Sequence, residues 1–183
     1  MLVRPPPRVP WRVLGLDPGS RRTGYGLIEC QGRRSVHLAH GCIASADSAL
    51  ASRLRLIFEA VSALIAEHRP DEIAVERVFV NRNVDSALKL GQARGAALCA
   101  VPNGVPVFEY APRAIKQGVV GFGAADKHQV AHMMHTLLGL TAPMAHDASD
   151  ALAVALCHVH SRSGPLAEQL AALASRAGGG PAR

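Results

Sequence analysis

Four acidic residues stand at the ends of predicted structural elements, where their carboxylates can reach solvent and a ligand. Asp17 ends an apolar run and is followed by a Pro-Gly turn. Glu76 ends a second, shorter apolar run. Asp147 and Asp150 lie three residues apart at the start of the last predicted helix, which puts them on one helix face. If the two strands are neighbours and the helix begins beside their ends, all four carboxylates converge.

Such a cluster is unfavourable when it is uncompensated, because like charges repel one another in a low-dielectric cleft. Divalent cations remove this repulsion, and a ligand set made only of oxygen atoms suits Mg²⁺ or Mn²⁺. Two such ions roughly 3.5–4 Å apart serve phosphodiester hydrolysis, since one activates the attacking water and the other stabilises the leaving oxygen. The four acids therefore favour a metal-dependent phosphodiesterase site.

Each acid also has a purely structural interpretation. Asp17 can simply begin a hairpin turn. The two helix acids can interact favourably with the helix dipole. Glu76 can pair with Arg77 or Arg82. Taken singly, these interpretations are the better ones, but the order and local setting of all four acids together favour a shared site.

Hydrophobic periodicity supplies the elements that would position these acids. Three strand-like runs at hairpin spacing predict an antiparallel meander, and helices then alternate with single strands. The predicted strands are 11–17, 23–30, 36–43, 72–76 and 105–110, and the predicted helices are 49–68, 84–100, 112–119, 127–138 and 147–160. This order predicts an α/β fold with a mixed five-stranded sheet, three antiparallel strands followed by parallel strands, flanked by helices.

The 183 residues predict one main domain with dissimilar ends. We expect a basic, Pro-rich and disordered arm at 1–10, a nuclease domain at 11–161, and a disordered Ala/Gly-rich tail at 162–183. The net charge of +6 favours a polyanionic partner such as nucleic acid.

Cysteine usage and hydropathy predict a cytoplasmic protein that does not enter a membrane. Cys30, Cys42, Cys99 and Cys157 form no Cys-x-x-Cys pair, and we interpret them as reduced thiols of the core. No apolar run reaches the roughly 18 residues of a membrane span. The basic N-terminus lacks the apolar segment of a signal peptide.

Several motifs resemble RuvC, the bacterial family of Holliday-junction resolvases. The resemblance covers about residues 13–160 and is most specific at 85–95, which is similar to the central helix of the family. The other matching segments are 14–20, 23–26, 74–79, 107–111, 115–117, 119–121 and 147–153.

The resemblance implies an RNase H-like fold and a homodimeric, structure-selective endodeoxyribonuclease. Members of this family cut four-way DNA junctions by paired symmetric nicks during recombination and DNA repair, and they work with the RuvA–RuvB branch-migration complex. Carried over residue by residue, the resemblance implies that Asp17, Glu76, Asp147 and Asp150 are the catalytic acids. It also implies that these acids hold two Mg²⁺ ions, with Mn²⁺ as the other possible metal.

The resemblance also implies DNA contacts outside the acid cluster. Phe79 matches an aromatic residue that stacks near the junction centre, as a ring can on an unpaired base. Lys116 and Lys127 match lysines that engage DNA near the cleaved phosphate. Arg82 and Arg113 are further candidates for contacts with the DNA backbone.

Three other functions fit part of the pattern. An RNase H-like nuclease could use the same acids on an RNA-containing duplex, and the match at 85–95 argues against it. A non-catalytic junction-binding module would be expected to lack one of the acids. An actin-like or sugar-kinase-like ATPase could open with Asp-x-Gly-Ser, but it needs a second domain, for which 183 residues leave no room.

Overall fold

The computed structural model describes residues 9–32, 34–44, 49–77 and 84–163 and confirms the predicted α/β fold. Its strands are β1 (Trp11–Asp17), β2 (Arg22–Gln31), β3 (Arg34–Ala44), β4 (Glu72–Glu76) and β5 (Val107–Tyr110). Its helices are α1 (Leu50–His68), α2 (Val84–Cys99), α3 (Pro112–Val120), α4 (Lys127–Leu138) and α5 (His146–Ser163).

The sheet is mixed, as predicted, with the strand order β3-β2-β1-β4-β5. β1 pairs antiparallel with β2, and β2 pairs antiparallel with β3. β4 pairs parallel with both β1 and β5. In the parallel register Leu16 lies opposite Val75, so Asp17 and Glu76, which follow them, end neighbouring strands at the same edge of the sheet.

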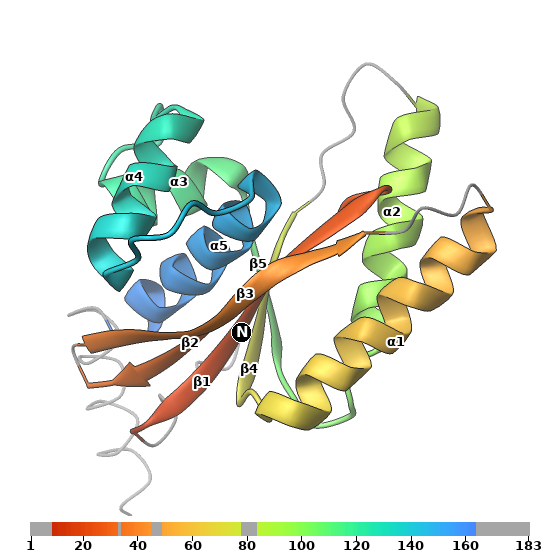
Figure 1. Ribbon diagram of the computed structural model, residues 1–183, viewed down its shortest axis with the longest axis horizontal. Helices are drawn as coiled ribbons and strands as arrows, with labels where there is room; N and C mark the ends of the chain where they lie inside the picture. The colour runs from red at the N-terminus through yellow and green to blue at the C-terminus, as the bar shows by residue number, and fades with distance from the viewer. Residues whose placement is uncertain (1–8, 33, 45–48, 78–83, 164–183) are drawn as a thin grey trace, which may run out of the picture.

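Helices cover the sheet on both faces. In Figure 1, α1 and α2 lie on one face, and α3, α4 and α5 lie on the other. Leu14 and Leu16 of β1 pack with α1 and α2, whereas Val13 packs with α3, α4 and α5, as the two-residue period of a strand requires. Apart from Asp150, every residue from 148 to 159 is buried, so α5 is the central helix of its layer.

Glycines in β1 and β2 let α5 approach the sheet very closely. A Cβ atom on Gly15 would lie 2.1 Å from the carbonyl oxygen of Ala151, and one on Gly24 would lie 1.9 Å from that of Asp147. Gly26 allows a similar approach farther along β2. These contacts leave no space for a side chain, and they seat the first turn of α5 beside the end of β1.

The last turn of α5 is anchored in a buried polar network. Arg162 donates to Oε1 of Glu72 over 2.9 Å, and Nε2 of His158 lies 2.6 Å from Oε2 of the same carboxylate. Nδ1 of His158 lies 2.7 Å from the hydroxyl of Tyr110. α5 ends at Ser163, three residues beyond the end predicted for this helix at 160.

The expectation that all four cysteines are core thiols is wrong for two of them. All four are free, but only Cys30 and Cys157 are buried. Cys42 is half-buried on β3, and Cys99 is exposed as the last residue of α2, whose buried residues are Ala93 and Ala97.

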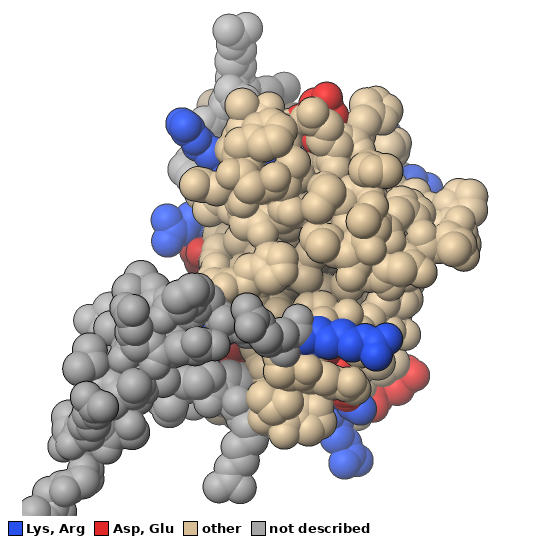
Figure 2. All heavy atoms as spheres, turned by 90° about the vertical axis from the view of Figure 1, so that its left-hand side faces the viewer, with Lys and Arg blue, Asp and Glu red and all other residues tan. Residues whose placement is uncertain are grey.

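No described helix is suited to crossing a membrane, and the described surface on the side seen in Figure 2 has no broad basic face. Within the part of the chain that the structure describes, no helix has the length and apolar character needed to cross a bilayer. Figure 2 looks onto the side where α3 and α4 lie, and the described surface there is mainly uncharged, with Lys and Arg at its margins. The net positive charge alone therefore does not locate a DNA-binding surface.

The close packing of α5 on Gly15 predicts the effect of adding a methyl group at this position of β1. We expect Gly15→Ala to lower the free energy of unfolding by about 3 kcal/mol, because backbone atoms of α5 have to move. Gly95→Ala is the matched control in α2, where a Cβ has open space, and it should raise stability by roughly 0.5–1 kcal/mol. Urea unfolding measures both, and a Gly15→Ala variant as stable as the wild type would contradict the close approach.

Candidate active site

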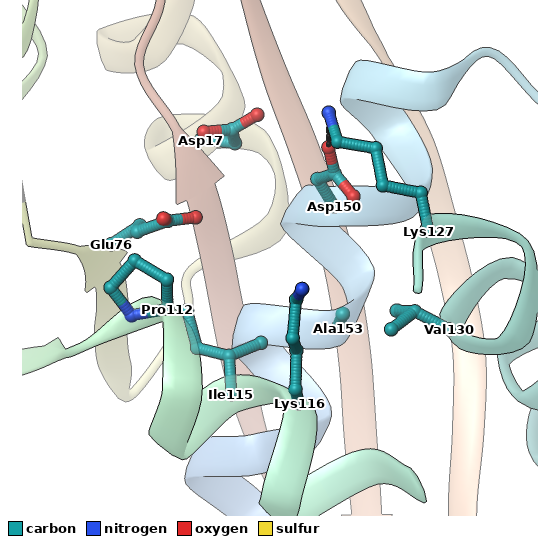
Figure 3. Close-up of a pocket in the computed structure, with 9 residues that line it drawn as sticks. All are labelled: Asp17, Glu76, Pro112, Ile115, Lys116, Lys127, Val130, Asp150 and Ala153. Atoms are coloured by element: carbon teal, nitrogen blue, oxygen red, sulfur yellow. Dashed lines mark ion pairs between the residues drawn. The ribbon is translucent and has the colours of Figure 1, made fainter. Parts of the chain in front are cut away.

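A pocket brings three of the four predicted acids together with both predicted lysines (Figure 3). Asp17 comes from β1, Glu76 from β4 and Asp150 from α5. The full lining is Asp17, Glu76, Pro112, Ile115, Lys116, Lys127, Val130, Asp150 and Ala153. Its wall thus combines carboxylates and ammonium groups with apolar side chains.

The lysines come from two short helices that pack on α5. α3 begins with Pro112, which is favoured in the first turn of a helix, and presents Lys116 one turn later. α4 begins at Lys127 behind a capping box formed by Asp126 and Gln129. Because this cap sets where the helix starts, it also directs Lys127 toward Asp150, with Nζ 3.8 Å from Oδ2.

The pKa of Asp17 is raised to about 6. Burial is the largest cause, because it disfavours the charged form of the carboxyl. The negative charges of Asp150 and Asp147 raise the pKa further, and the positive charge of Lys127 offsets part of the effect.

The pKa of Glu76 is raised to about 7, again mainly by burial and then by the charges of Asp17 and Asp150. Lys127 and Lys116 act in the opposite direction. Burial also raises the pKa of Asp150. The pocket therefore holds more negative charge than its two lysines compensate.

Asp147 lies beside the pocket and is not part of its lining. Its Oδ2 is 3.9 Å from a guanidinium nitrogen of Arg22 and 3.9 Å from Sγ of Cys42. Sequence analysis missed both neighbours. The strand register could have indicated Cys42, because this residue lies opposite Gly24 and the first turn of α5 packs on Gly24.

The comparison with protein families matches residues 13–158 of the chain to the model described as "Crossover junction endodeoxyribonuclease RuvC". The chain belongs to the RuvC family.

Curated relatives of the same description support this membership over most of their length. The RuvC protein of Methylococcus capsulatus is 57% identical over 152 residues, which cover 82% of this chain and 92% of the relative. The RuvC protein of Shewanella loihica is 55% identical over 150 residues, which cover 81% of this chain and 87% of the relative.

Solved structures confirm the predicted RNase H-like fold of this RuvC family member. The structure of Thermus thermophilus RuvC in complex with a Holliday junction substrate matches with a TM-score of 0.78 and 34% identity, covering 84% of this chain and 95% of that one. The yeast mitochondrial Holliday junction resolvase Ydc2 matches with a TM-score of 0.67 at 12% identity, over 96% of this chain and 86% of that one, which is a likeness of fold alone.

Of the other three residues predicted to contact DNA, the structure describes only Arg113. Arg113 is exposed on α3 and does not line the pocket. Its side chain lies against Gly123, where an added Cβ would be 2.5 Å from Cγ of the arginine. Phe79 and Arg82 lie outside the described residues, so their roles in this RuvC family member remain predictions.

The donor atoms of the pocket suit a hard divalent cation, and nucleases of the RuvC family are metal-dependent. Asp17, Glu76 and Asp150 offer only oxygen atoms, which Mg²⁺ and Mn²⁺ prefer. Within the described ranges, no three His, Cys, Asp or Glu side chains are already arranged as a complete ligand group. Asp150 instead lies in an ion pair with Lys127, whose Nζ is 3.8 Å from Oδ2.

The raised pKa values predict how stability depends on pH when no divalent cation is present. The pKa of Glu76 is about 7 in the fold against an ordinary value of 4.5. The carboxyl group therefore contributes its full stability to the fold below about pH 4.5, and this stability is lost as the pH rises through about 7. Glu76→Gln removes this loss. We expect the variant to unfold at pH 8 with a free energy on the order of 1–2 kcal/mol above the wild type, after allowance for partial exposure.

Urea unfolding between pH 4 and pH 8 in EDTA measures this difference. Glu59→Gln, at an exposed position of α1, is the matched control and should keep the wild-type pH profile. A Glu76→Gln variant that follows the wild-type profile would show that burial of the ionised Glu76 carboxylate beside Asp17 and Asp150 does not lower the stability of the fold.

Proposed function

We propose that this chain is a structure-selective endodeoxyribonuclease that resolves four-way DNA junctions by paired symmetric nicks during recombination and DNA repair. The observation that carries most weight is the pocket in which Asp17, Glu76 and Asp150 meet Lys116 and Lys127, in a member of the RuvC family. Both kinds of group serve phosphodiester hydrolysis, because the carboxylates can hold cations and the ammonium groups can compensate the charge of the phosphate.

The acids would hold two Mg²⁺ ions, with Mn²⁺ as the other possible metal. Asp17, Glu76 and Asp150 supply oxygen donors from three different elements, and Asp147 lies next to them on α5. When bound, the ions would lower the pKa of the attacking water and offset the charge that develops on the leaving oxygen. Burial of the acids beside one another supports this role, since it makes their ionised forms depend on a nearby cation.

The lysines would act directly on the phosphate. Lys116 and Lys127 reach the pocket from two helices, so they can hold the scissile phosphate between them and stabilise the negative charge that forms on its oxygens. In-line attack would leave a 3′-hydroxyl and a 5′-phosphate, which a ligase can rejoin. Phe79, Arg82 and Arg113 would add contacts to the bases and backbone of the junction arms.

The apolar face of α2 supports a homodimer. Val84 is 66% exposed and Leu88 is 62% exposed, although both are large and apolar. Together with Ala87, Gly91 and Gln92 they line a shallow groove along one side of the helix. A second copy of the chain would bury this groove and supply a second pocket, which accounts for paired nicks in a symmetric substrate.

From the resemblance to the family, we further propose that the dimer works in the cytoplasm with the RuvA–RuvB branch-migration complex.

The dimer is tested by placing a charge in the groove. We expect Leu88→Glu to shift the protein from dimer to monomer at micromolar concentration, because two buried carboxylates would face each other across the interface. Sedimentation velocity measures the change. Leu137→Glu, at a position of α4 that is 41% exposed, is the matched control and should remain dimeric. A dimeric Leu88→Glu variant would rule out this face of α2 as the interface.

The activity is tested on a synthetic mobile four-way junction with Mg²⁺, beside a linear duplex and an RNA–DNA hybrid. The wild type should make paired, ligatable nicks in the junction alone. Asp17→Asn should reduce cleavage on the order of 10³-fold or more while junction binding is kept, since the change removes a negative charge and leaves the lysines in place. Glu59→Gln should cut like the wild type.

Other results of this cleavage assay would favour a different function or a different role for Asp17. Equal cutting of the hybrid would favour a nuclease acting on RNA-containing duplexes. Junction binding without any cleavage by the wild type would favour a binding module. Loss of binding together with cleavage in Asp17→Asn would count against the assignment of this acid.

A further inference from the structure

An arginine of α2 reaches the end of β4 from behind the pocket. Nε of Arg94 donates to the backbone carbonyl oxygen of Glu76 over 3.4 Å. The carboxyl of Glu76 lines the pocket with residues of α3, α4 and α5, whereas α2 covers the opposite face of the sheet (Figure 1). Arg94 therefore holds the peptide of Glu76 from one face while the side chain works on the other.

A second carboxylate fixes the direction of this arginine. The guanidinium of Arg94 pairs with Oε1 of Glu109, the residue before the last of β5. Nε of Arg77 lies 3.6 Å from Oε2 of the same carboxylate. Glu109 thus pairs with two guanidinium groups, and it compensates the charge of Arg94. Arg94 consequently acts on Glu76 through a directed hydrogen bond more than through its electric field.

The contact between Arg94 and the Glu76 carbonyl lies at the end of β4, where the strand reaches the pocket. Glu76 is the last residue of β4, and Arg77 is joined to β5 by a hydrogen bond from its backbone N–H to the carbonyl of Tyr110 over 2.8 Å. The carbonyl oxygen of Glu76 accepts a hydrogen bond from the Arg94 side chain at this end of the strand. The side chain of Arg94 is 19% exposed, so it is packed into this site and does not extend into solvent.

We propose that Arg94 is a positioning residue for Glu76: oriented by Glu109, it fixes the Glu76 peptide and so aims the Glu76 carboxylate at the divalent cation. This inference rests on the proposed function, because it assigns a partner to one of the proposed metal-holding acids. Residues that orient metal ligands in this way typically change metal affinity or activity by about 10-fold to 100-fold when they are replaced.

The first readout is Mn²⁺ binding by the full-length protein, measured from the electron paramagnetic resonance signal of free Mn²⁺. Arg94→Ala should raise the dissociation constant for Mn²⁺ about 10-fold. The Mg²⁺ concentration needed for half-maximal junction cleavage should rise by a similar factor, while junction binding in EDTA is unchanged. Arg94→Lys keeps the ion pair with Glu109 but loses the fork geometry, so it should fall between Arg94→Ala and the wild type.

Arg55→Ala is the matched control, because Arg55 is exposed on α1 and the same positive charge is removed. It should bind Mn²⁺ like the wild type. Arg94→Ala that binds Mn²⁺ and responds to Mg²⁺ like this control would overturn the proposal. If Arg94→Ala does not fold, Glu109→Gln and Arg94→Lys decide instead, and wild-type Mn²⁺ binding by both folded variants would overturn it.

Failure of this inference differs from failure of the proposed function. A wild-type protein that does not cut the junction would remove the proposed function, whatever Arg94 does to Mn²⁺ binding. A wild-type protein that cuts the junction, with Arg94→Ala equal to it in both readouts, would remove only the role of Arg94.

Discussion

The close seat of α5 on the sheet is the contact on which the rest of the site depends. Gly15 and Gly24 let the backbone of the helix lie where a Cβ atom would otherwise stand. That approach sets the first turn of α5 beside the end of β1, with Asp147 and Asp150 near Asp17. α3 and α4 pack on the same helix and bring the lysines, so one backbone contact fixes the relative position of acids and bases.

Placing these acids together in a partly buried pocket destabilises their ionised forms, and the two lysines offset this only in part. The pKa values of Asp17 and Glu76 are raised to about 6 and about 7, because burial and like charges oppose ionisation. A fold selected for stability alone would place apolar or paired side chains here. Excess carboxylate in a partly buried pocket is instead the condition under which a divalent cation binds favourably, and a stability deficit at the site is a common property of catalytic pockets.

Much of the fold could be predicted from the sequence because its signals are local, and three acids that line the pocket could be singled out because each stands at or near the end of an element. The bounds of β1, β4 and α4 are as predicted, since apolar runs there end at clear turn or cap residues. The contacts of Asp147 with Arg22 and Cys42 could not be predicted in the same way, because they depend on strand register and helix docking. The Arg94 contact has no local signal either, as it joins a helix to a strand that ends 18 residues earlier.

The central claim is that the carboxylates of Asp17, Glu76 and Asp150, with Asp147 beside them, form one divalent-cation site. The most direct test is anomalous diffraction from crystals of the full-length protein soaked in Mn²⁺ at a concentration that supports junction cleavage. The account predicts Mn²⁺ peaks between these carboxylates, and their loss in crystals of Asp17→Asn. Mn²⁺ bound only at other residues, or a pocket without Mn²⁺ at that concentration, would contradict it.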